Sequence, residues 1–344
     1  MRVLVTGADG YIGVLLVQLL LDRGHDVVGV DAGFFSDGWL YNDVARLPPC
    51  AKKDIRHLSE QDLKGFDAVV HLAEISNDSP GRLNPKTTFA INHFGSVGLA
   101  RRCRAAGIPR FVYASSCSVY GRGSDDVRTE ESEPEPQTAY ATCKVLVERD
   151  VSSLADAGFS PTFLRNATAY GPSPKMRFDL VLNDLSGQAW TTNRIVLTSD
   201  GTAWRPFVHV LDICEAVACV IDAPREIVHN EIFNLGDSHE NYRITDIARI
   251  VSTVFPRCEV TVSGGHRDSR SYRVSFEKIT SRLPRFRCRR NATMGAIELR
   301  QLFERIDMGR EVFQCRAYTR LKQLEYLATT QQVDDRLFWT QRSS

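Results

Sequence analysis

The chain has 344 residues, of which 43% are hydrophobic and 25% are charged, and its formal net charge at pH 7 is +1. This length and composition predict a soluble protein with one large α/β domain and a smaller partner domain. The near-neutral charge excludes the strongly basic class of proteins that bind nucleic acid or anionic membranes, so we expect neither as a partner.

The nine cysteines show no C-x-x-C spacing, and their number is odd. This usage favours reduced thiols and argues against a disulfide framework and against a metal site such as zinc. The chain begins with a strand-like run at Arg2, without the charged segment of a signal peptide, and the apolar run Leu15–Leu21 is too short to cross a bilayer. We therefore expect a cytoplasmic protein that holds no metal.

The first predicted strand, Arg2–Thr6, runs directly into a glycine-rich turn. Glycines follow at Gly7, Gly10 and Gly13, and a helical pattern continues to Arg23. A strand that turns into a helix over three glycines is typical of a dinucleotide-binding site. The glycines let the backbone approach a pyrophosphate, which then binds the free N–H groups of the first helical turn. The sequence therefore predicts a dinucleotide cofactor.

Asp31 indicates which dinucleotide binds. It follows the second predicted strand, Asp26–Val30, and lies 18 residues after Gly13. An acid at this place can hydrogen-bond both ribose hydroxyls of NAD, and its charge repels the 2′-phosphate of NADP. We therefore predict that the cofactor is NAD.

Strand-like and helix-like segments alternate along the rest of the chain. This alternation predicts an α/β fold with a doubly wound parallel sheet of the Rossmann type and helices on both faces. A last helical stretch is expected from Met294, with Thr293 as its N-cap. The other predicted strands are Ala68–Leu72, Phe111–Ala114, Thr162–Arg165 and Ile232–Leu235, and the other predicted helices are Thr87–Ala106, Tyr140–Ala157 and Leu211–Ala223.

Two irregular stretches late in the chain suggest a second, smaller domain. Residues 171–205 are rich in Pro, Gly, Asn and Thr, and residues 258–292 are basic and irregular. We expect an NAD-binding Rossmann domain formed by residues 1–170, to which 206–237 return. Residues 171–205 and 238–344 would form an irregular C-terminal substrate-binding lobe and a helical tail, covering the carboxyl edge of the sheet.

Residues with catalytic potential follow the strand Phe111–Ala114. It ends in serines, including Ser116, and Tyr140 and Lys144 follow about two dozen residues later. Residues four apart lie on one face of a helix, so Tyr140 and Lys144 point the same way. The ammonium lowers the pKa of the tyrosine toward the working pH, and such a tyrosine can exchange a proton with a sugar hydroxyl. This spacing is common on amphipathic helices, but here it lies downstream of a dinucleotide turn.

Taken together, these motifs resemble the extended short-chain dehydrogenase/reductase family, in matching order over about residues 1–290. The later motifs are similar to its nucleotide-sugar epimerase and dehydratase branch. The matching segments are T-G-A-D-G-Y-I-G from Thr6, Asp54-Ile55, V-V-H-L-A from Val69, V-Y-G from Val119, Tyr140 with Lys144, Leu164-Arg165, Y-G-P from Tyr170 and R-P-F-V-H-V from Arg205.

The resemblance implies a set of site residues. The catalytic trio would be Ser116, Tyr140 and Lys144. Arg205 would bind the nucleotide diphosphate, because a planar guanidinium binds phosphate oxygens bidentately. The implied NAD contacts, besides Tyr140 and Lys144, are Gly7, Gly10, Tyr11, Ile12, Gly13, Asp31, Asp54, Ile55, Leu72 and Ala73. The implied substrate contacts are Ser76, Ser118, Thr168, Asn183, Arg205 and Arg270.

Several departures from the family pattern limit what the resemblance implies. Thr168 stands where Asn is usual, and the second diphosphate-binding arginine has no clear match, so Arg267 and Arg270 are both candidates. Dehydratases of this family carry an Asp-Glu pair after the catalytic Ser or Thr. Cys117 and Ser118 occupy those positions here, so that acid and base are missing.

Glu74 is a further departure, because a small residue is common at this position beside the expected nicotinamide. It follows the strand Ala68–Leu72, at the edge of a parallel sheet where ligands bind. Burial there would raise the pKa of its carboxyl group and let it serve as a second proton-transfer group, exchanging a proton on a carbon next to a keto group. The alternative is a partly exposed loop residue without a chemical role.

We interpret the chain as an NAD-dependent epimerase of a nucleotide-activated sugar, acting through a transient keto sugar and redox-neutral overall. One alternative is a dehydratase in which Cys117 or Glu74 replaces the missing acid–base pair, and another is a simple NAD-dependent sugar dehydrogenase or reductase. A scaffold without catalysis is disfavoured because the trio is intact. The expected partners are a nucleotide-diphosphate sugar substrate and a second copy of the chain, in a homodimer.

Overall fold

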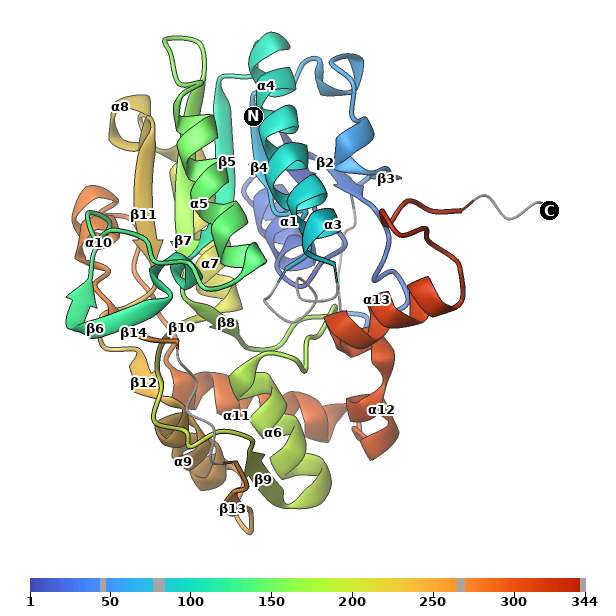
Figure 1. Cartoon of the computed structure of the whole chain (residues 1–344), viewed down its shortest axis with the longest axis vertical. Helices are drawn as coiled ribbons and strands as arrows, with labels where there is room; N and C mark the ends of the chain where they lie inside the picture. The colour runs from blue at the N-terminus through green and yellow to red at the C-terminus, as the bar shows by residue number, and fades with distance from the viewer. Residues whose placement is uncertain (44–47, 77–83, 265–269, 341–344) are drawn as a thin grey trace.

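The computed structural model describes residues 1–43, 48–76, 84–264 and 270–340 (Figure 1). A seven-stranded sheet lies in the upper half of this view, with its strands in the order β11-β7-β5-β4-β1-β2-β3 and every neighbouring pair parallel. The predicted doubly wound α/β fold is therefore confirmed. The strands are β1 (Arg2–Thr6), β2 (Asp26–Asp31), β3 (Cys50–Lys52), β4 (Ala68–His71), β5 (Arg110–Ser116), β7 (Ser160–Asn166) and β11 (Glu231–Leu235).

Helices cover both faces of the sheet because successive side chains of a strand point to opposite faces. On β1, Val3 and Val5 belong to the hydrophobic cluster formed with α1 (Gly13–Asp22) and α7 (Val210–Asp222). Leu4 belongs instead to the cluster that contains Leu99 of α4 and Val147 of α5. These two helices span Ser96–Ala105 and Ala139–Ser152. Both faces of the sheet are thus buried, as a parallel sheet requires.

The strand order reverses direction between β1 and β4. From β1 the chain moves outward to β2 and β3, whereas β4, β5, β7 and β11 follow one another on the other side. The loops after β1 and β4 therefore leave in opposite directions and open a crevice at the carboxyl edge. The functional site is expected in this crevice.

The structure corrects several element boundaries. The predicted helix Thr87–Ala106 is a run of α3 (Pro85–Thr88), the π-helical η3 (Phe89–Gly95) and α4, and it begins after the N-cap Asn84. The predicted helix Tyr140–Ala157 ends at Ser152. The edge strand β3 was not predicted, because three exposed residues carry no hydrophobic periodicity.

The predicted cap of the last long helix is wrong. Asn291, not Thr293, caps α11 (Ala292–Arg305), since its side-chain oxygen accepts a hydrogen bond of 2.9 Å from the backbone N–H of Met294. Both residue types are good caps, so local preference alone could not choose between them.

A smaller lobe lies below the carboxyl edge of the sheet (Figure 1). Its core is a second hydrophobic cluster that includes Phe178, Leu182, Val251 and Phe303. The remaining elements of the chain are η1 (Ile55–His57), η2 (Gln61–Leu63), η4 (Cys117–Tyr120), β6 (Arg122–Arg128), β8 (Thr168–Tyr170), α6 (Val181–Thr192), β9 (Arg194–Leu197), β10 (Trp204–His209), α8 (Arg225–Val228), β12 (Asn241–Arg243), α9 (Ile244–Val254), β13 (Glu259–Val262), β14 (Ser271–Val274), α10 (Glu277–Arg282), α12 (Arg310–Gln314), η5 (Arg316–Tyr318) and α13 (Arg320–Thr329).

Two expected absences concern membranes and metals. Within the described ranges, no helix combines the length and the apolar character needed to cross a membrane. Those same ranges contain no group of His, Cys, Asp and Glu side chains arranged to hold a metal ion.

His71 is a fully buried titratable group at the carboxyl end of β4. Its Nδ1 lies 2.6 Å from Thr6 Oγ1 and its Nε2 lies 2.8 Å from Ser96 Oγ. Burial lowers the pKa of His71 to about 3, and the nearby charge of Lys144 adds to this shift. The folded protein therefore holds this imidazole neutral.

We predict that His71 makes the protein acid-sensitive. Between pH 6.5 and about 3 the unfolded chain binds a proton at this residue and the folded chain does not. Stability is therefore lost as the pH falls through this window, by about 1.4 kcal/mol per pH unit below 6.5. Urea unfolding at pH 7, 6 and 5 should show a shallower loss for His71→Asn than for the wild type. His239→Asn, at an exposed histidine, is the control, and equal slopes for His71→Asn and the wild type would contradict the prediction.

Candidate active site

The turn after β1 is packed so closely that two of its glycine positions have no room for a side chain. Gly7 has a φ of +74°, and a Cβ atom there would lie 2.9 Å from the backbone nitrogen of Ala73. A Cβ on Gly13 would lie 2.1 Å from the carbonyl oxygen of Gly7. These positions therefore require glycine, and α1 begins at Gly13 with its first N–H groups directed to the turn.

A cavity adjoins this turn and fits a dinucleotide. Asp31 lies on its wall, and its carboxylate accepts hydrogen bonds from the backbone N–H groups of Asp9 (3.1 Å) and Gly33 (2.8 Å). Backbone N–H groups at a helix start suit a diphosphate, and the aspartate suits a ribose. The predicted cofactor residues that line this cavity are Gly7, Gly10, Tyr11, Ile12, Gly13, Asp31, Asp54, Ile55, Leu72 and Ala73.

Tyr11 ties the glycine turn to the smaller lobe. Its hydroxyl donates a 2.8 Å hydrogen bond to the carbonyl oxygen of Gly171, and burial raises its pKa. Asn183 donates to the same hydroxyl at 3.3 Å and accepts from the Gly171 N–H at 2.9 Å. Asn183 is fully buried and lines neither this cavity nor the neighbouring one. The geometry thus places it as a support for Tyr11, away from the predicted substrate contacts.

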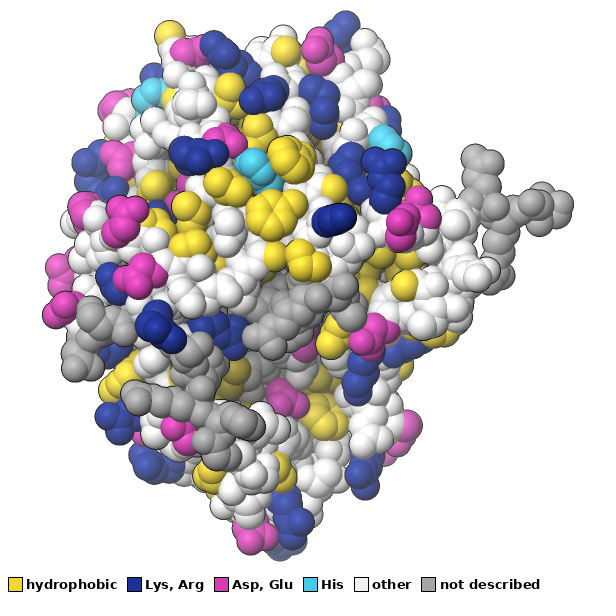
Figure 2. All heavy atoms as spheres, viewed as in Figure 1, with side chains coloured by type: hydrophobic (Ala, Val, Ile, Leu, Met, Phe, Trp, Pro, Cys, Tyr) yellow, Lys and Arg dark blue, Asp and Glu magenta, His cyan; other side chains and the backbone are white. Residues whose placement is uncertain are grey.

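A second cavity adjoins the first, and Ile12, Leu72 and Glu74 line both. It lies between the carboxyl edge of the sheet and the smaller lobe, where Figure 2 shows the surface hollowed. It is lined by the predicted trio Ser116, Tyr140 and Lys144 and by the predicted substrate residues Ser76, Ser118, Thr168, Arg205 and Arg270.

The trio comes from two neighbouring elements. Ser116 ends β5, and its hydroxyl accepts a 3.2 Å hydrogen bond from the Ser118 N–H. Tyr140 and Lys144 lie on the first turns of α5, which begins after its N-cap Thr138. The Lys144 ammonium is 5.3 Å from the centre of the Tyr140 ring, so the two side chains share one face of the helix as predicted.

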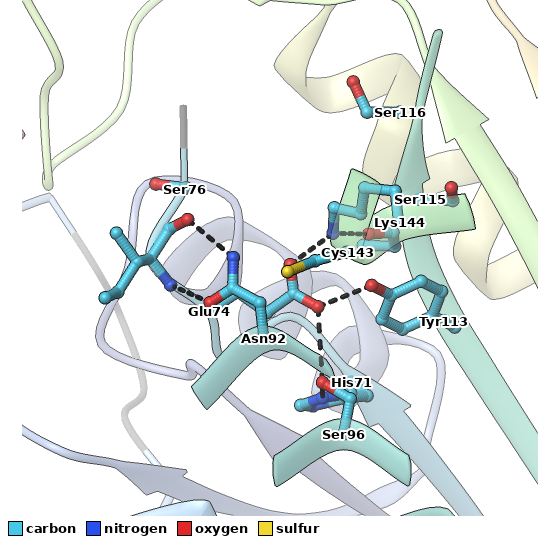
Figure 3. A network of polar contacts seen from close by, with 12 residues as sticks. His71, Glu74, Ser76, Asn92, Ser96, Tyr113, Ser115, Ser116, Cys143 and Lys144 are labelled. Carbon is cyan, nitrogen blue, oxygen red and sulfur yellow. Dashed lines mark hydrogen bonds and ion pairs between the residues drawn. The ribbon is translucent and has the colours of Figure 1, made fainter. Parts of the chain in front are cut away.

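Glu74 and Lys144 form a buried ion pair in which Glu74 Oε2 lies 2.5 Å from Lys144 Nζ (Figure 3). Its other oxygen, Oε1, accepts hydrogen bonds from the hydroxyls of Tyr113 (2.5 Å) and Ser96 (3.3 Å). Lys144 also donates to the carbonyl oxygen of Ala114 at 2.5 Å. The Glu74 side chain is only 3% exposed, although the residue as a whole, on the loop after β4, is partly exposed.

The ion pair keeps Lys144 charged although it is buried. Burial alone would lower the pKa of Lys144, but the negative charges of Glu74 and Tyr140 outweigh that effect and raise it. Burial also raises the pKa of Tyr113, and the adjacent Glu74 carboxylate raises it further, so the phenol stays a hydrogen-bond donor. A lysine held as an ammonium is the state that assists a catalytic tyrosine.

Cys117 does not face the second cavity. It is 1% exposed, and its thiol donates to the carbonyl oxygen of Arg165 at 3.1 Å. Burial raises its pKa well above the ordinary value of a thiol. It lines neither cavity, which counts against its use as an acid or a base on a substrate.

The two arginines expected near a nucleotide diphosphate are brought together. Arg205 donates to the carbonyl oxygens of Trp204, at 2.8 Å, and of Arg270. Its guanidinium also lies 5.2 Å from the centre of the Tyr272 ring, and Arg205, Arg270 and Tyr272 line the second cavity. The other candidate, Arg267, lies outside the described residues.

The sequence motifs missed two arginines. Arg177 lines both cavities, pairs with Asp179 at 3.0 Å and donates to Ser76 Oγ at 3.2 Å. Arg320 lines the first cavity from α13. Arg177 follows the P-S-P segment and Arg320 lies near the C-terminus, and no local pattern marks either as part of a site. In the sequence, these two residues are recognisable only as cations in segments without a regular pattern.

A family model described as the NAD dependent epimerase/dehydratase family matches residues 3–236. The chain belongs to this family. Its cofactor is accordingly NAD, as the glycine turn and Asp31 predict.

The chain is also similar in sequence and structure to individual proteins. The chain is 30% identical over 272 residues to a UDP-glucose 4-epimerase of Corynebacterium glutamicum, covering 74% of this chain and 80% of that one. It is 28% identical to a UDP-N-acetyl-alpha-D-glucosaminuronate decarboxylase of Bacillus cytotoxicus, covering 81% and 84%. The solved structure of MoeE5 in complex with UDP-glucuronic acid and NAD is similar with a TM-score of 0.76 and 27% identity, covering 89% of this chain and 99% of that one.

We predict that Asp31 sets the preference for NAD over NADP. In the Asp31→Ala protein the ratio of the NADP and NAD dissociation constants should fall roughly tenfold or more. The reason is that a like charge no longer opposes the 2′-phosphate. Titration of both dinucleotides by calorimetry measures the ratio. Asp26→Ala, at an exposed acid on the same strand, should leave it unchanged. Tighter binding of NADP than of NAD by the wild type would contradict the prediction.

Proposed function

We propose that this protein is an epimerase of a nucleotide-activated sugar, with NAD recycled in each turnover. The observation that carries the proposal is a pair of adjoining cavities that share lining residues. The first fits the cofactor, and the second brings Ser116, Tyr140 and Lys144 together with Arg205 and Arg270.

Arg205 and Arg270 would bind the diphosphate of the substrate, because guanidinium groups match pairs of phosphate oxygens. Ser76, Ser118 and Thr168 line the same cavity and would bind the sugar. Arg177 lies where the two cavities join, and it would help to orient both ligands.

Tyr140 would take the proton from one sugar hydroxyl as that carbon is oxidised. It would return the proton when the other face of the keto carbon is reduced. Ser116, at the end of β5, would hydrogen-bond the same oxygen. Lys144, kept as an ammonium by Glu74, would favour the phenolate of Tyr140. When bound, NAD supplies the group that accepts a hydride from the sugar carbon and gives it back.

The site favours an epimerase over the alternatives. The acid–base pair of the dehydratases is absent, and Cys117, one proposed replacement, is buried against Arg165 away from the cavity. A redox-neutral reaction also agrees with relatives described as UDP-glucose 4-epimerases, one of them 30% identical. We therefore take UDP-glucose as the first substrate to test.

A homodimer formed through α4 and α5 is part of the proposal. Figure 2 shows hydrophobic side chains gathered on this face, and Phe94 of η3, beside these helices, is 66% exposed. Exposed apolar surface of this kind is typical of a subunit interface. The cytoplasmic location and the division into an NAD-binding domain and a substrate lobe stay predictions.

We expect a product of the same mass as the substrate and no accumulation of NADH. The test is incubation with UDP-, GDP-, CDP- and dTDP-sugars, followed by mass spectrometry and NMR. A product lighter by one water would support the dehydratase, and stoichiometric NADH would support the dehydrogenase. Tyr140→Phe keeps the ring and its packing, so turnover should fall roughly 10²–10⁴-fold while NAD binding persists. Near-normal turnover in that variant would contradict the mechanism.

The contacts of Glu74 favour a positioning role over proton exchange with the substrate. One oxygen pairs with Lys144 and the other accepts from Tyr113 and Ser96. A carboxylate engaged in this way would have to break a buried ion pair before it could remove a carbon-bound proton. We propose that Glu74 acts through Lys144. The configuration would be inverted because the keto sugar rotates in the site before hydride returns to its other face.

We predict that Glu74→Gln moves the alkaline limb of the pH–rate profile to lower pH. The carboxylate raises the pKa of Lys144, so its loss lets Lys144 release its proton at a lower pH. Tyr113→Phe removes a hydrogen bond but no charge, so this control should keep the limb in place. Turnover in D₂O should leave product carbons free of deuterium. Deuterium that enters in the wild type and not in Glu74→Gln would make Glu74 a base instead.

A further inference from the structure

The C-terminal segment 316–340 packs against the loop that follows β2. Gln323 donates a 2.9 Å hydrogen bond to the carbonyl oxygen of Phe34, and Trp339 donates one of 2.7 Å to that of Ala32. Leu324 of α13 joins the same loop in a small hydrophobic cluster. Figure 1 shows α13 on the side of the molecule where β2 and the edge strand β3 lie. The segment lies beyond the residues 3–236 that match the family model, so the family pattern assigns it no role.

Arg320, the first residue of α13, is a buried cation on the wall of the cofactor cavity. It is 4% exposed, and its guanidinium lies 3.8 Å from the centre of the Phe35 ring. Its side chain forms no hydrogen bond with any of the residues that the structure describes. Burial lowers its pKa, and the nearby positive charge of Arg177 adds to this shift. Three nearby carboxylates oppose the shift but do not cancel it.

The other charged groups on this side of the cavity already have partners. Lys175 pairs with Asp9 at 3.0 Å, and Arg177 pairs with Asp179 at 3.0 Å. Asp31 accepts two backbone N–H groups. A buried guanidinium without an acceptor is costly, and the cost disappears when an anion enters the cavity and accepts its hydrogen bonds.

We propose that Arg320 binds a phosphate oxygen of the NAD diphosphate, so that segment 316–340 forms one wall of the cofactor site. The same cavity is lined by Gly10, Ile12 and Gly13, at the helix start where a diphosphate binds. A cation on the wall of the same cavity adds charge-assisted hydrogen bonds that the backbone alone cannot supply. The C-terminal tail thus belongs to the cofactor site, whichever sugar is the substrate.

The experiment measures binding rather than activity. NAD-depleted wild type, Arg320→Met and Lys322→Met are titrated with NAD and ADP-ribose by calorimetry, and with adenosine by NMR. Methionine keeps an aliphatic chain against Phe35 and removes the charge. Lys322 is an exposed cation on the same helix, so Lys322→Met controls for the loss of one positive charge.

We predict that Arg320→Met weakens both NAD and ADP-ribose roughly 10- to 100-fold, the usual worth of a hydrogen bond to a charged group. Adenosine, which has no phosphate, should bind the variant and the wild type equally, and Lys322→Met should behave as the wild type. Unchanged binding of ADP-ribose by Arg320→Met would overturn the proposal, and so would an equal loss for adenosine. If Arg320→Met does not fold, Arg320→Gln is judged by the same outcomes.

Discussion

The turn after β1 can lie against the end of β4 only because Gly7 has no side chain. A Cβ there would come within 2.9 Å of the Ala73 backbone, and one on Gly13 would come within 2.1 Å of the Gly7 carbonyl. Because the turn is this tight, α1 starts at the crevice where the strand order reverses, with its N–H groups facing the cavity. Tyr11, in the same turn, then donates a hydrogen bond to the carbonyl oxygen of Gly171 in the smaller lobe.

A buried polar network extends from this turn into the candidate active site. Thr6 of β1 contacts His71, His71 contacts Ser96, and Ser96 donates to Glu74, which pairs with Lys144. Each side chain in the network bonds to the next one through a hydrogen bond or an ion pair. The charges of Glu74 and Lys144 therefore compensate each other, and the side chains are held in one arrangement. The state of Lys144 is therefore coupled to the strand that carries the glycine turn.

The C-terminal segment shows how a distant part of the chain can contribute to a cavity. It docks on the loop after β2 through hydrogen bonds to the carbonyl oxygens of Phe34 and Ala32. That docking buries Arg320 beside Phe35 and turns it toward the cofactor cavity.

The sequence by itself determined the sheet, the glycine turn and the NAD cofactor, because these depend on local spacing: alternating strands and helices, three glycines and Asp31. It also placed Tyr140 and Lys144 on one helix face, since helical geometry has a fixed period. Only the tertiary structure decided that Glu74 pairs with Lys144, that Asn183 supports Tyr11, and that Arg320 reaches the cofactor cavity. Some of those contacts join residues 70 to nearly 300 positions apart, and others depend on which side of a loop faces inward. No local sequence pattern encodes the distant contacts or the orientation of the loop.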